Sequence, residues 1–239
     1  MTLSNAECSA CIEMLFREIP DPAGRIRAAK AAGYGAVEFW LWSDKDLPAL
    51  KAARRETGLA VAGFCAEPMI SLNDPANQAR FLAALPASIA VAQRLGAPSL
   101  FIQGGSLVQG ASRDTQAASL AAVLSQAADV LQGSGVTLLL EPVSDADNGF
   151  LTHAADGLAI VAAVNRPEIR LLYDLFHAAV AGEDLRATAA GKVELIGHVH
   201  VADHPGRGAP GTGRLPLDAD IVWLRDQGYR GRFGMEYSP

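Results

Sequence analysis

Four polar side chains able to bind a metal stand at or next to the ends of short apolar runs. Three are carboxylates and one is an imidazole: Glu141, Asp174, His200 and Glu236. Burying such groups together without a cation would be costly, because an unpaired buried charge either neutralises or destabilises a fold. A mostly oxygen ligand set with one nitrogen suits Mg²⁺ or Mn²⁺, and Co²⁺ is also compatible. We therefore expect one divalent metal ion, held by these four side chains.

The elements that must position these groups are predicted from hydrophobic periodicity. Short apolar runs alternate with longer amphipathic segments, which is the pattern of repeated β-α-β units around a parallel sheet. Eight runs are expected to be strands: residues 8–14, 36–40, 59–65, 98–103, 136–141, 169–174, 195–201 and 232–236. The sequence therefore predicts an α/β fold, a single (β/α)₈ TIM barrel in one domain over residues 1–239. Active sites of such barrels lie at the C-terminal ends of the strands, where the four side chains are expected.

Alternation along the strands favours an inward direction for these groups. In the run VTLLLE, Leu138 and Leu140 share one face of the strand and Glu141 has the other. In the run HVHV, the two valines lie opposite His198 and His200. We expect the apolar faces to meet the helices and the polar faces to point into the barrel mouth. His198 would lie one layer deeper than His200, as a supporting or core histidine.

Composition limits the classes of partner. The chain has 239 residues and a formal net charge of -6, and half of its residues are apolar. An acidic chain gives no broad attraction to phosphate backbones or anionic lipid, so we expect no nucleic-acid and no membrane partner. No stretch approaches the roughly 18 apolar residues of a membrane span, and we expect a cytoplasmic protein. The expected partner is a small-molecule substrate, and a homo-oligomer is possible.

Two short motifs carry weaker signals, and the motif of the competing architecture is missing. Cys8 and Cys11 form a C-x-x-C motif without a second pair, which favours structural thiols over a zinc site. The segment QGGS at 103–106 offers backbone N–H groups to an anion, but two glycines alone are a weak phosphate signal. Residues 14–24 lack the glycine-rich loop that usually follows the first strand of a doubly wound sheet, the competing architecture.

A family resemblance covers most of the chain. It lies in the stretches FLTHAADGLAIVAAVNRPEIRLLYDLFHAAVAGEDL, LIGHVHVADHPGRGAPGTG and RGRFGMEYSP, which resemble hydroxypyruvate isomerases within the xylose isomerase-like barrel superfamily. The resemblance implies acid and base roles for Glu141 and Glu236, with Asp174 and residue 200 completing the metal shell. Hydroxypyruvate isomerases commonly have glutamine where this chain has His200, whereas the related ketose 3-epimerases have histidine there. The resemblance therefore leaves both substrate classes open.

Further polar side chains are candidates for the mouth. His177 follows the sixth expected strand and could orient a substrate, or it could be a polar residue at a helix start. Arg207, in HPGRGAPGTG, could hold a substrate carboxylate with its planar guanidinium or be a solvated loop charge. Asp147 lies where ketose 3-epimerases carry a substrate-binding glutamate, and could otherwise be a turn residue in SDADNG. Glu38 and Glu67 also end strands and could line the mouth.

The expected chemistry is proton transfer beside a carbonyl group. A base removes a proton from the carbon next to the carbonyl, a metal stabilises the enediolate charge, and the proton returns to the neighbouring carbon. We expect Glu141 and Glu236 to move this proton in an isomerase of hydroxypyruvate and tartronate semialdehyde, or of a 2-oxotetronate. A ketose 3-epimerase and a non-catalytic ligand-binding barrel are the alternatives.

Two other enzyme classes are disfavoured by the residues present. A DNA-repair endonuclease of the same superfamily would need many more histidines than the five in this chain, together with a basic groove. A hydride-shift sugar isomerase would need a second metal site, and the sequence offers no evident second set of ligands.

Overall fold

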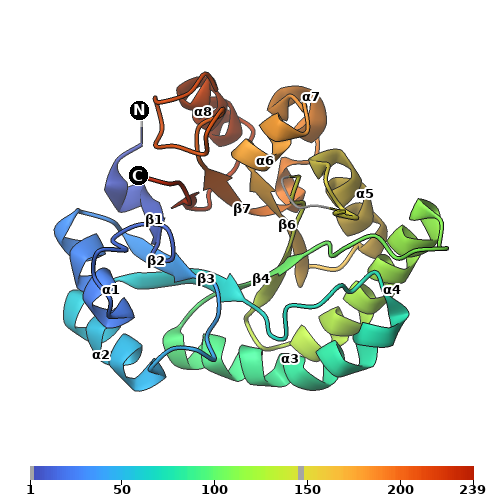
Figure 1. The fold of residues 1–239 in the computed structure, drawn as a ribbon, viewed down its shortest axis with the longest axis horizontal. Helices are drawn as coiled ribbons and strands as arrows, with labels where there is room; N and C mark the ends of the chain where they lie inside the picture. Colours follow the sequence, from blue (N-terminus) through green and yellow to red (C-terminus); the bar gives the residue numbers. More distant parts are fainter. Residues whose placement is uncertain (1–2, 145–147) are drawn as a thin grey trace.

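The computed structural model describes residues 3–144 and 148–239, which form a closed parallel β-barrel (Figure 1). The strands follow one another around the barrel in chain order, and β1 pairs with β8 to close it. They are β1 (Cys8–Cys11), β2 (Ala36–Phe39), β3 (Ala60–Cys65), β4 (Ser99–Gln103), β5 (Thr137–Glu141), β6 (Ile169–Asp174), β7 (Ile196–Val201) and β8 (Phe233–Met235). The predicted (β/α)₈ barrel is confirmed.

Helices surround the barrel and cover the outer face of the sheet (Figure 1). They are α1 (Pro22–Ala31), α2 (Leu47–Thr57), α3 (Pro75–Leu95), α4 (Arg113–Leu131), α5 (Ala154–Val164), α6 (Leu175–Val180), α7 (Leu185–Ala189) and α8 (Leu217–Asp226). Two short 3₁₀ helices, η1 (Asn5–Glu7) and η2 (Val193–Leu195), precede β1 and β7. None of the helices in the described part of the chain is both long and apolar enough to cross a membrane.

The starts of the first three long helices follow directly from the sequence. Asp21, Asp46 and Asp74 each accept a hydrogen bond from a backbone N–H in the first turn of α1, α2 and α3. Each of these helices also carries proline at its first or second position, where no intrahelical N–H bond is lost. Well-defined helix starts fix the loops that leave the C-terminal ends of the strands.

The strands separate an outer apolar layer from the barrel interior. Leu138 and Leu140 of β5 pack in the large core beneath the helices, which also contains Leu120 of α4. Leu139 points the other way and belongs to a smaller interior cluster with Cys65, Phe101 and Leu172. Glu141 shares the interior face with Leu139, so the predicted inward direction of this carboxylate is confirmed by the packing.

The first strand is shorter than the sequence predicts. The apolar run extends over residues 8–14, but β1 ends at Cys11. The backbone N–H groups of Met14 and Leu15 both donate to the carbonyl of Cys11, which turns the chain away from the sheet. Ile12 and Leu15 in this turn are buried like the residues of the strand. The apolar run is therefore longer than the strand itself.

Candidate active site and metal centre

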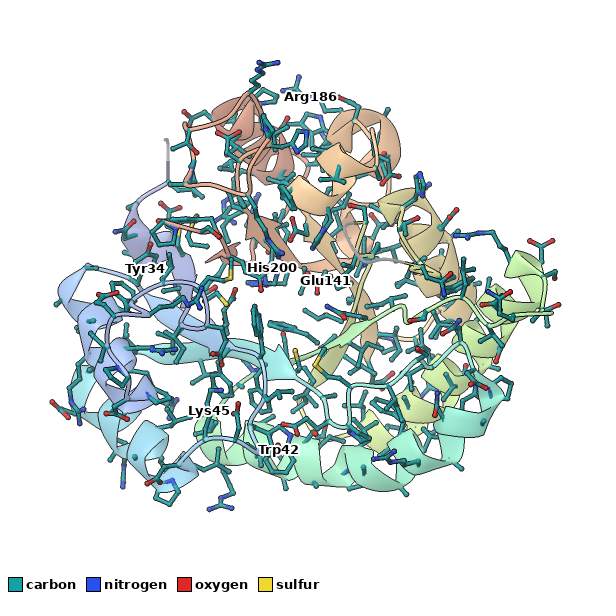
Figure 2. The ribbon with its side chains drawn as sticks, viewed as in Figure 1. Tyr34, Trp42, Lys45, Glu141, Arg186 and His200 are labelled. Carbon is teal, nitrogen blue, oxygen red and sulfur yellow. The ribbon has the colours of Figure 1, made fainter. Side chains whose placement is uncertain are left out.

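The four expected metal ligands meet at the C-terminal mouth of the barrel. Glu141 ends β5 and Asp174 ends β6, while His200 lies on β7 and Glu236 directly follows β8. All four side chains are buried, and one donor atom of each lies within 4.8 Å of the donors of the others. Figure 2 shows Glu141 and His200 close together at the centre of the barrel.

The imidazole of His200 provides the reference point for the geometry. Its Nδ1 atom lies 3.2 Å from Oε1 of Glu141, 3.3 Å from Oε2 of Glu236 and 3.9 Å from Oδ2 of Asp174. Donor atoms arranged around one ion at bond lengths of about 2.0 to 2.2 Å are separated by similar distances. The residues present therefore fit a single small divalent cation.

Asp174 gives a direct test of that fit. Its Oδ1 atom accepts hydrogen bonds from the N–H groups of Phe176 and His177 and so caps α6. Its Oδ2 atom is buried and, among the described residues, accepts no hydrogen bond. A buried carboxylate oxygen without a donor is costly unless a cation satisfies it. Oδ2 lies 3.9 Å from Nδ1 of His200 and 3.9 Å from Nη2 of Arg207, close enough to share a metal ion with His200.

Glu236 lies in a different hydrogen-bond environment. Its Oε1 atom accepts a hydrogen bond from the indole N–H of Trp40 at 2.8 Å and a weaker one from the thiol of Cys11 at 3.7 Å. Its Oε2 atom accepts from the guanidinium of Arg207 at 2.7 Å. Burial opposes ionisation of Glu236, but His200, Arg207 and Trp40 together lower the pKa of this carboxyl to about 2.

The pKa values of Glu141 and His200 are both raised. Burial raises the pKa of Glu141, the contact with His200 opposes this shift, and the charges of Glu236 and Asp174 add to it. Burial alone would lower the pKa of His200, but the surrounding carboxylates, above all Glu236 and Glu38, raise it well above its usual value. In the absence of a cation, the site therefore retains protons that a metal ion would displace.

A cavity of about 330 Å³ opens above the four ligands. Its lining includes Glu141, His200 and Glu236 together with Trp40, Leu41, Cys65, Met69, Phe101, Gln103, Val143, His177 and Arg207. This volume lies at the lower end for ligand pockets and suits a small molecule. Trp40 and Gln103 were missed by the sequence analysis. Each is the last residue of a predicted strand, 36–40 or 98–103. The search for polar side chains at strand ends, which identified the four ligands, could therefore have identified these two as well.

The structure places two of the three expected substrate-binding residues at this cavity. His177, in the first turn of α6, is buried with its Nε2 atom 3.8 Å from Oδ2 of Asp174. Arg207 passes over the ring of Phe176, with its guanidinium carbon 5.3 Å from the ring centre. Its φ of 54° is in the left-handed region, which lets the loop turn the side chain back over the mouth. Asp147 lies outside the described residues.

The remaining candidates have other positions. Glu38 does not line the cavity but is buried inside the barrel, where it contacts His198 and His200. Glu67 accepts hydrogen bonds from the backbone N–H groups of Trp42 and Ser43 and so fixes the loop after β2.

The motif of Cys8 and Cys11 is split between two environments. All three cysteines of the chain are free and buried. Cys8 donates to the carbonyl of Ser4, whereas Cys11 contacts Glu236 at the active site. The two thiols therefore do not act as a pair, and Cys11 has a place beside a candidate ligand that the motif alone did not indicate.

Comparisons with known proteins agree with this architecture. Residues 26–239 match the family described as xylose isomerase-like TIM barrel. A human protein named "Putative hydroxypyruvate isomerase" is 34% identical over 97% of this chain and 89% of its own length. The Escherichia coli hydroxypyruvate isomerase is 29% identical over 97% of this chain and 93% of its own length.

A solved structure also superposes over nearly the whole barrel. The crystal structure of a Brucella melitensis protein described as an AP endonuclease of family 2 matches with a TM-score of 0.90 and 27% identity. It covers 97% of this chain and 92% of the Brucella chain. The chain therefore belongs to the xylose isomerase-like TIM-barrel family and, within it, to the hydroxypyruvate isomerase family.

Proposed function

We propose that the protein is a metal-dependent isomerase that moves a proton between neighbouring carbons of a small hydroxy-carbonyl acid. Hydroxypyruvate with tartronate semialdehyde, or a 2-oxotetronate, are the substrates that we favour. The observation that carries the proposal is the group of four buried ligands, which includes the orphaned Oδ2 atom of Asp174. Glu141, His200 and Glu236 of this group line a cavity of about 330 Å³. The hydroxypyruvate isomerase names of the relatives support the same reaction class.

Glu141, Asp174, His200 and Glu236 would hold one Mg²⁺ or Mn²⁺ ion, with Co²⁺ as a further possibility. When bound, the ion would polarise the substrate carbonyl and stabilise the negative charge that develops on the substrate oxygens. The protein contributes a cavity whose wall includes the apolar side chains of Phe101 and Val143. These side chains would limit the access of solvent to the reacting carbons.

The two glutamates have unequal roles in this proposal. The pKa of Glu141 is raised by burial, which makes this carboxylate the stronger proton acceptor. Glu236 is held as a stable anion by Trp40 and Arg207 and accepts a proton less readily. We therefore assign removal of the substrate proton to Glu141. We favour return of the proton to the substrate by Glu141 itself over transfer of the proton to Glu236. Glu236 would instead bind the metal ion and help to orient the substrate.

Arg207 supports a substrate that carries a carboxylate. Its guanidinium lines the cavity and is within 2.7 Å of Oε2 of Glu236 and 3.9 Å of Oδ2 of Asp174. A planar guanidinium can bind a carboxylate with two parallel hydrogen bonds, which neutral sugars cannot use in the same way. His177, on the same wall, would contact a substrate oxygen. A keto acid is therefore favoured over a neutral ketose.

A 3-epimerase of a small ketose is the second candidate, because His200 has the residue type that ketose 3-epimerases carry at this position. The two reactions differ in the carbon that receives the returning proton. Protein loaded with Mn²⁺ is incubated in heavy water with hydroxypyruvate, a 2-oxotetronate and a set of ketoses, and the products are followed by NMR. We expect deuterium in the aldehyde isomer of a keto acid.

Two outcomes would redirect the assignment. Deuterium at C3 of a ketose, with no aldehyde product, would replace the isomerase with an epimerase. No exchange with any compound would favour a ligand-binding barrel. DNA containing an abasic site serves as a negative control, and its incision would overturn the small-molecule assignment. A cytoplasmic location, a single domain over residues 1–239 and self-association stay proposals.

A further inference from the structure

A second polar cluster lies inside the barrel directly beneath the four metal ligands. It consists of Ser9 on β1, Glu38 on β2 and His198 on β7, and all three side chains are buried. Oε2 of Glu38 accepts a hydrogen bond from Oγ of Ser9 at 2.7 Å and lies 2.9 Å from Nε2 of His198. The other oxygen, Oε1, lies 3.1 Å from Nε2 of His200. The cluster therefore touches one metal ligand from below.

The surrounding residues leave the cluster little freedom to move. A Cβ atom at Gly234 would lie 2.5 Å from Oε1 of Glu38 and 2.7 Å from Nε2 of His198. The glycine of β8 thus makes room for the two side chains. On the other side, the ring of Phe101 stacks on His198 with 5.7 Å between ring centres and meets His200 edge to face. Such close packing holds one arrangement of the polar groups.

The two ring nitrogens of His200 face opposite partners. Nδ1 faces the carboxylates of Glu141 and Glu236, and Nε2 faces Glu38. A neutral imidazole carries one proton, and both ring nitrogens here lie near carboxylates. A cation bound at Nδ1 would leave the proton on Nε2, where Oε1 of Glu38 lies 3.1 Å away to accept it.

We propose that Glu38, held in place by Ser9 and His198, is a positioning residue that fixes the ring orientation and tautomer of His200 for metal binding. The proposal rests on the proposed metal site. Carboxylates that accept the second N–H of a ligating histidine orient the ring and raise its basicity in metal sites generally. Here the orienting carboxylate is itself fixed by two further side chains and by the absence of a side chain at Gly234.

A second cation between Glu38, His198 and His200 is the competing explanation, because their donor atoms also lie within 4.8 Å of one another. The sequence offered no evident second ligand set, whereas the structure brings this one together, and it is complete only because His200 is shared. Oε2 of Glu38 already has two hydrogen-bond partners, Ser9 and His198. A cation there would also require His200 to bind two ions at once. Oε1 of Glu38 and Nε2 of His200 are both buried and lie 3.1 Å apart without a well-aligned hydrogen bond between them. A proton on Nε2 directed at Oε1 would satisfy both atoms without an ion.

The first test is the affinity of the purified protein for Mn²⁺, measured by titration of wild type and Glu38→Gln. We expect one ion per chain in both, with affinity reduced by roughly 10- to 100-fold in Glu38→Gln. Glu67→Gln is the matched control, since Glu67 fixes a loop beside the mouth without contacting a ligand. Its affinity should stay within about twofold of wild type. Two ions per chain, with one lost in Glu38→Gln, would make Glu38 a ligand and overturn the proposal.

The second test reads the histidine directly by ¹⁵N NMR. Wild type loaded with Mg²⁺ should show His200 protonated at Nε2 and unprotonated at Nδ1, with a downfield Nε2–H signal. Glu38→Gln should shift that signal and weaken the preference for one tautomer. Unchanged Mn²⁺ affinity together with an unchanged His200 spectrum would overturn the proposal and leave Glu38 a structural residue of the core.

Two milder variants keep the test valid if Glu38→Gln fails to fold. Ser9→Ala removes one bond to Glu38, and we expect a loss of roughly 2- to 10-fold in Mn²⁺ affinity. Gly234→Ala keeps every polar group but displaces the cluster, and it should also weaken binding. Wild-type affinity in both folded variants would contradict the proposal. If wild type bound no Mn²⁺, the proposed metal function would fail, while the downfield Nε2–H signal would still test the contact between His200 and Glu38.

Discussion

The two sides of the barrel mouth carry the same residue type in different environments. On the β8 side, Glu236 accepts hydrogen bonds from the indole of Trp40 and the guanidinium of Arg207. On the β5 side, Glu141 is buried at the wall of the cavity and contacts Nδ1 of His200. Burial raises the pKa of Glu141, whereas the cationic and hydrogen-bonding partners lower that of Glu236 to about 2. The environment thus shifts the pKa values of two identical side chains in opposite directions, and this difference is the basis for our proposal that Glu141 accepts the substrate proton.

The largest expected effect comes from removing the proton acceptor. Glu141→Gln should reduce solvent deuterium exchange into the substrate by roughly 10² to 10⁴, even at saturating Mn²⁺, because the amide cannot accept the proton. Glu236→Gln should lose activity mainly through weaker metal binding, so high Mn²⁺ should restore part of it. Exchange rates across a Mn²⁺ series measure both effects. Equal loss in the two variants, with no recovery of Glu236→Gln, would remove the proposed asymmetry.

The guanidinium on the Glu236 side provides the next test. Arg207→Met removes the cation that pairs with Glu236 and the proposed partner of the substrate carboxylate. We expect KM for a keto acid to rise by roughly 10- to 100-fold, the usual effect of losing a hydrogen bond to a charged group. KM for a neutral ketose, if one reacts, should change far less. A similar rise for both substrate classes would show that Arg207 acts through the site geometry and not through the substrate carboxylate.

The two sides should also differ in their response to pH. Metal binding requires the unprotonated carboxylate of Glu141 and an unprotonated Nδ1 on His200, and the pKa values of both groups are raised. Affinity for Mn²⁺ should therefore fall as the pH decreases through these pKa values, by about tenfold per pH unit for each proton displaced. Glu236, with its pKa of about 2, should not contribute in the neutral range. Calorimetry in buffers of different ionisation enthalpy counts the protons released.

The smallest effect is expected at the indole of Trp40. Trp40→Phe keeps an aromatic ring at the cavity but removes the donor to Oε1 of Glu236. The pKa of Glu236 should rise, and Mn²⁺ affinity should fall by roughly 2- to 10-fold, because solvent can replace part of the bond at this half-exposed residue. An increase in Mn²⁺ affinity would mean that the indole competes with the ion for the carboxylate.

Strand alternation explains why much of the site could be predicted from the sequence. The runs around Leu138, Leu140 and Glu141 fix which side chains meet the helices and which enter the barrel, and the structure follows this pattern. The positions of Asp174 and His200 follow from the same rule applied to β6 and β7. Such predictions depend on local periodicity, which a single sequence carries in full.

The contacts between distant strands could not be predicted in the same way. Glu38 and His198 are separated by 160 positions, and their pairing depends on the register of a closed barrel. The glycine at 234 accommodates them, yet its role becomes visible only when a Cβ atom is placed there. The direction of Arg207 toward Glu236 likewise depends on a loop conformation with φ of 54°. Tertiary packing decides these features.

The most direct test of the account is anomalous diffraction from crystals soaked in Mn²⁺. The account predicts one strong peak at the barrel mouth, within bonding distance of Glu141, Asp174, His200 and Glu236 at about 2.0 to 2.3 Å. The ligating atom of His200 should be Nδ1. A peak elsewhere, a second peak between Glu38 and His198, or no peak at saturating Mn²⁺ would contradict it.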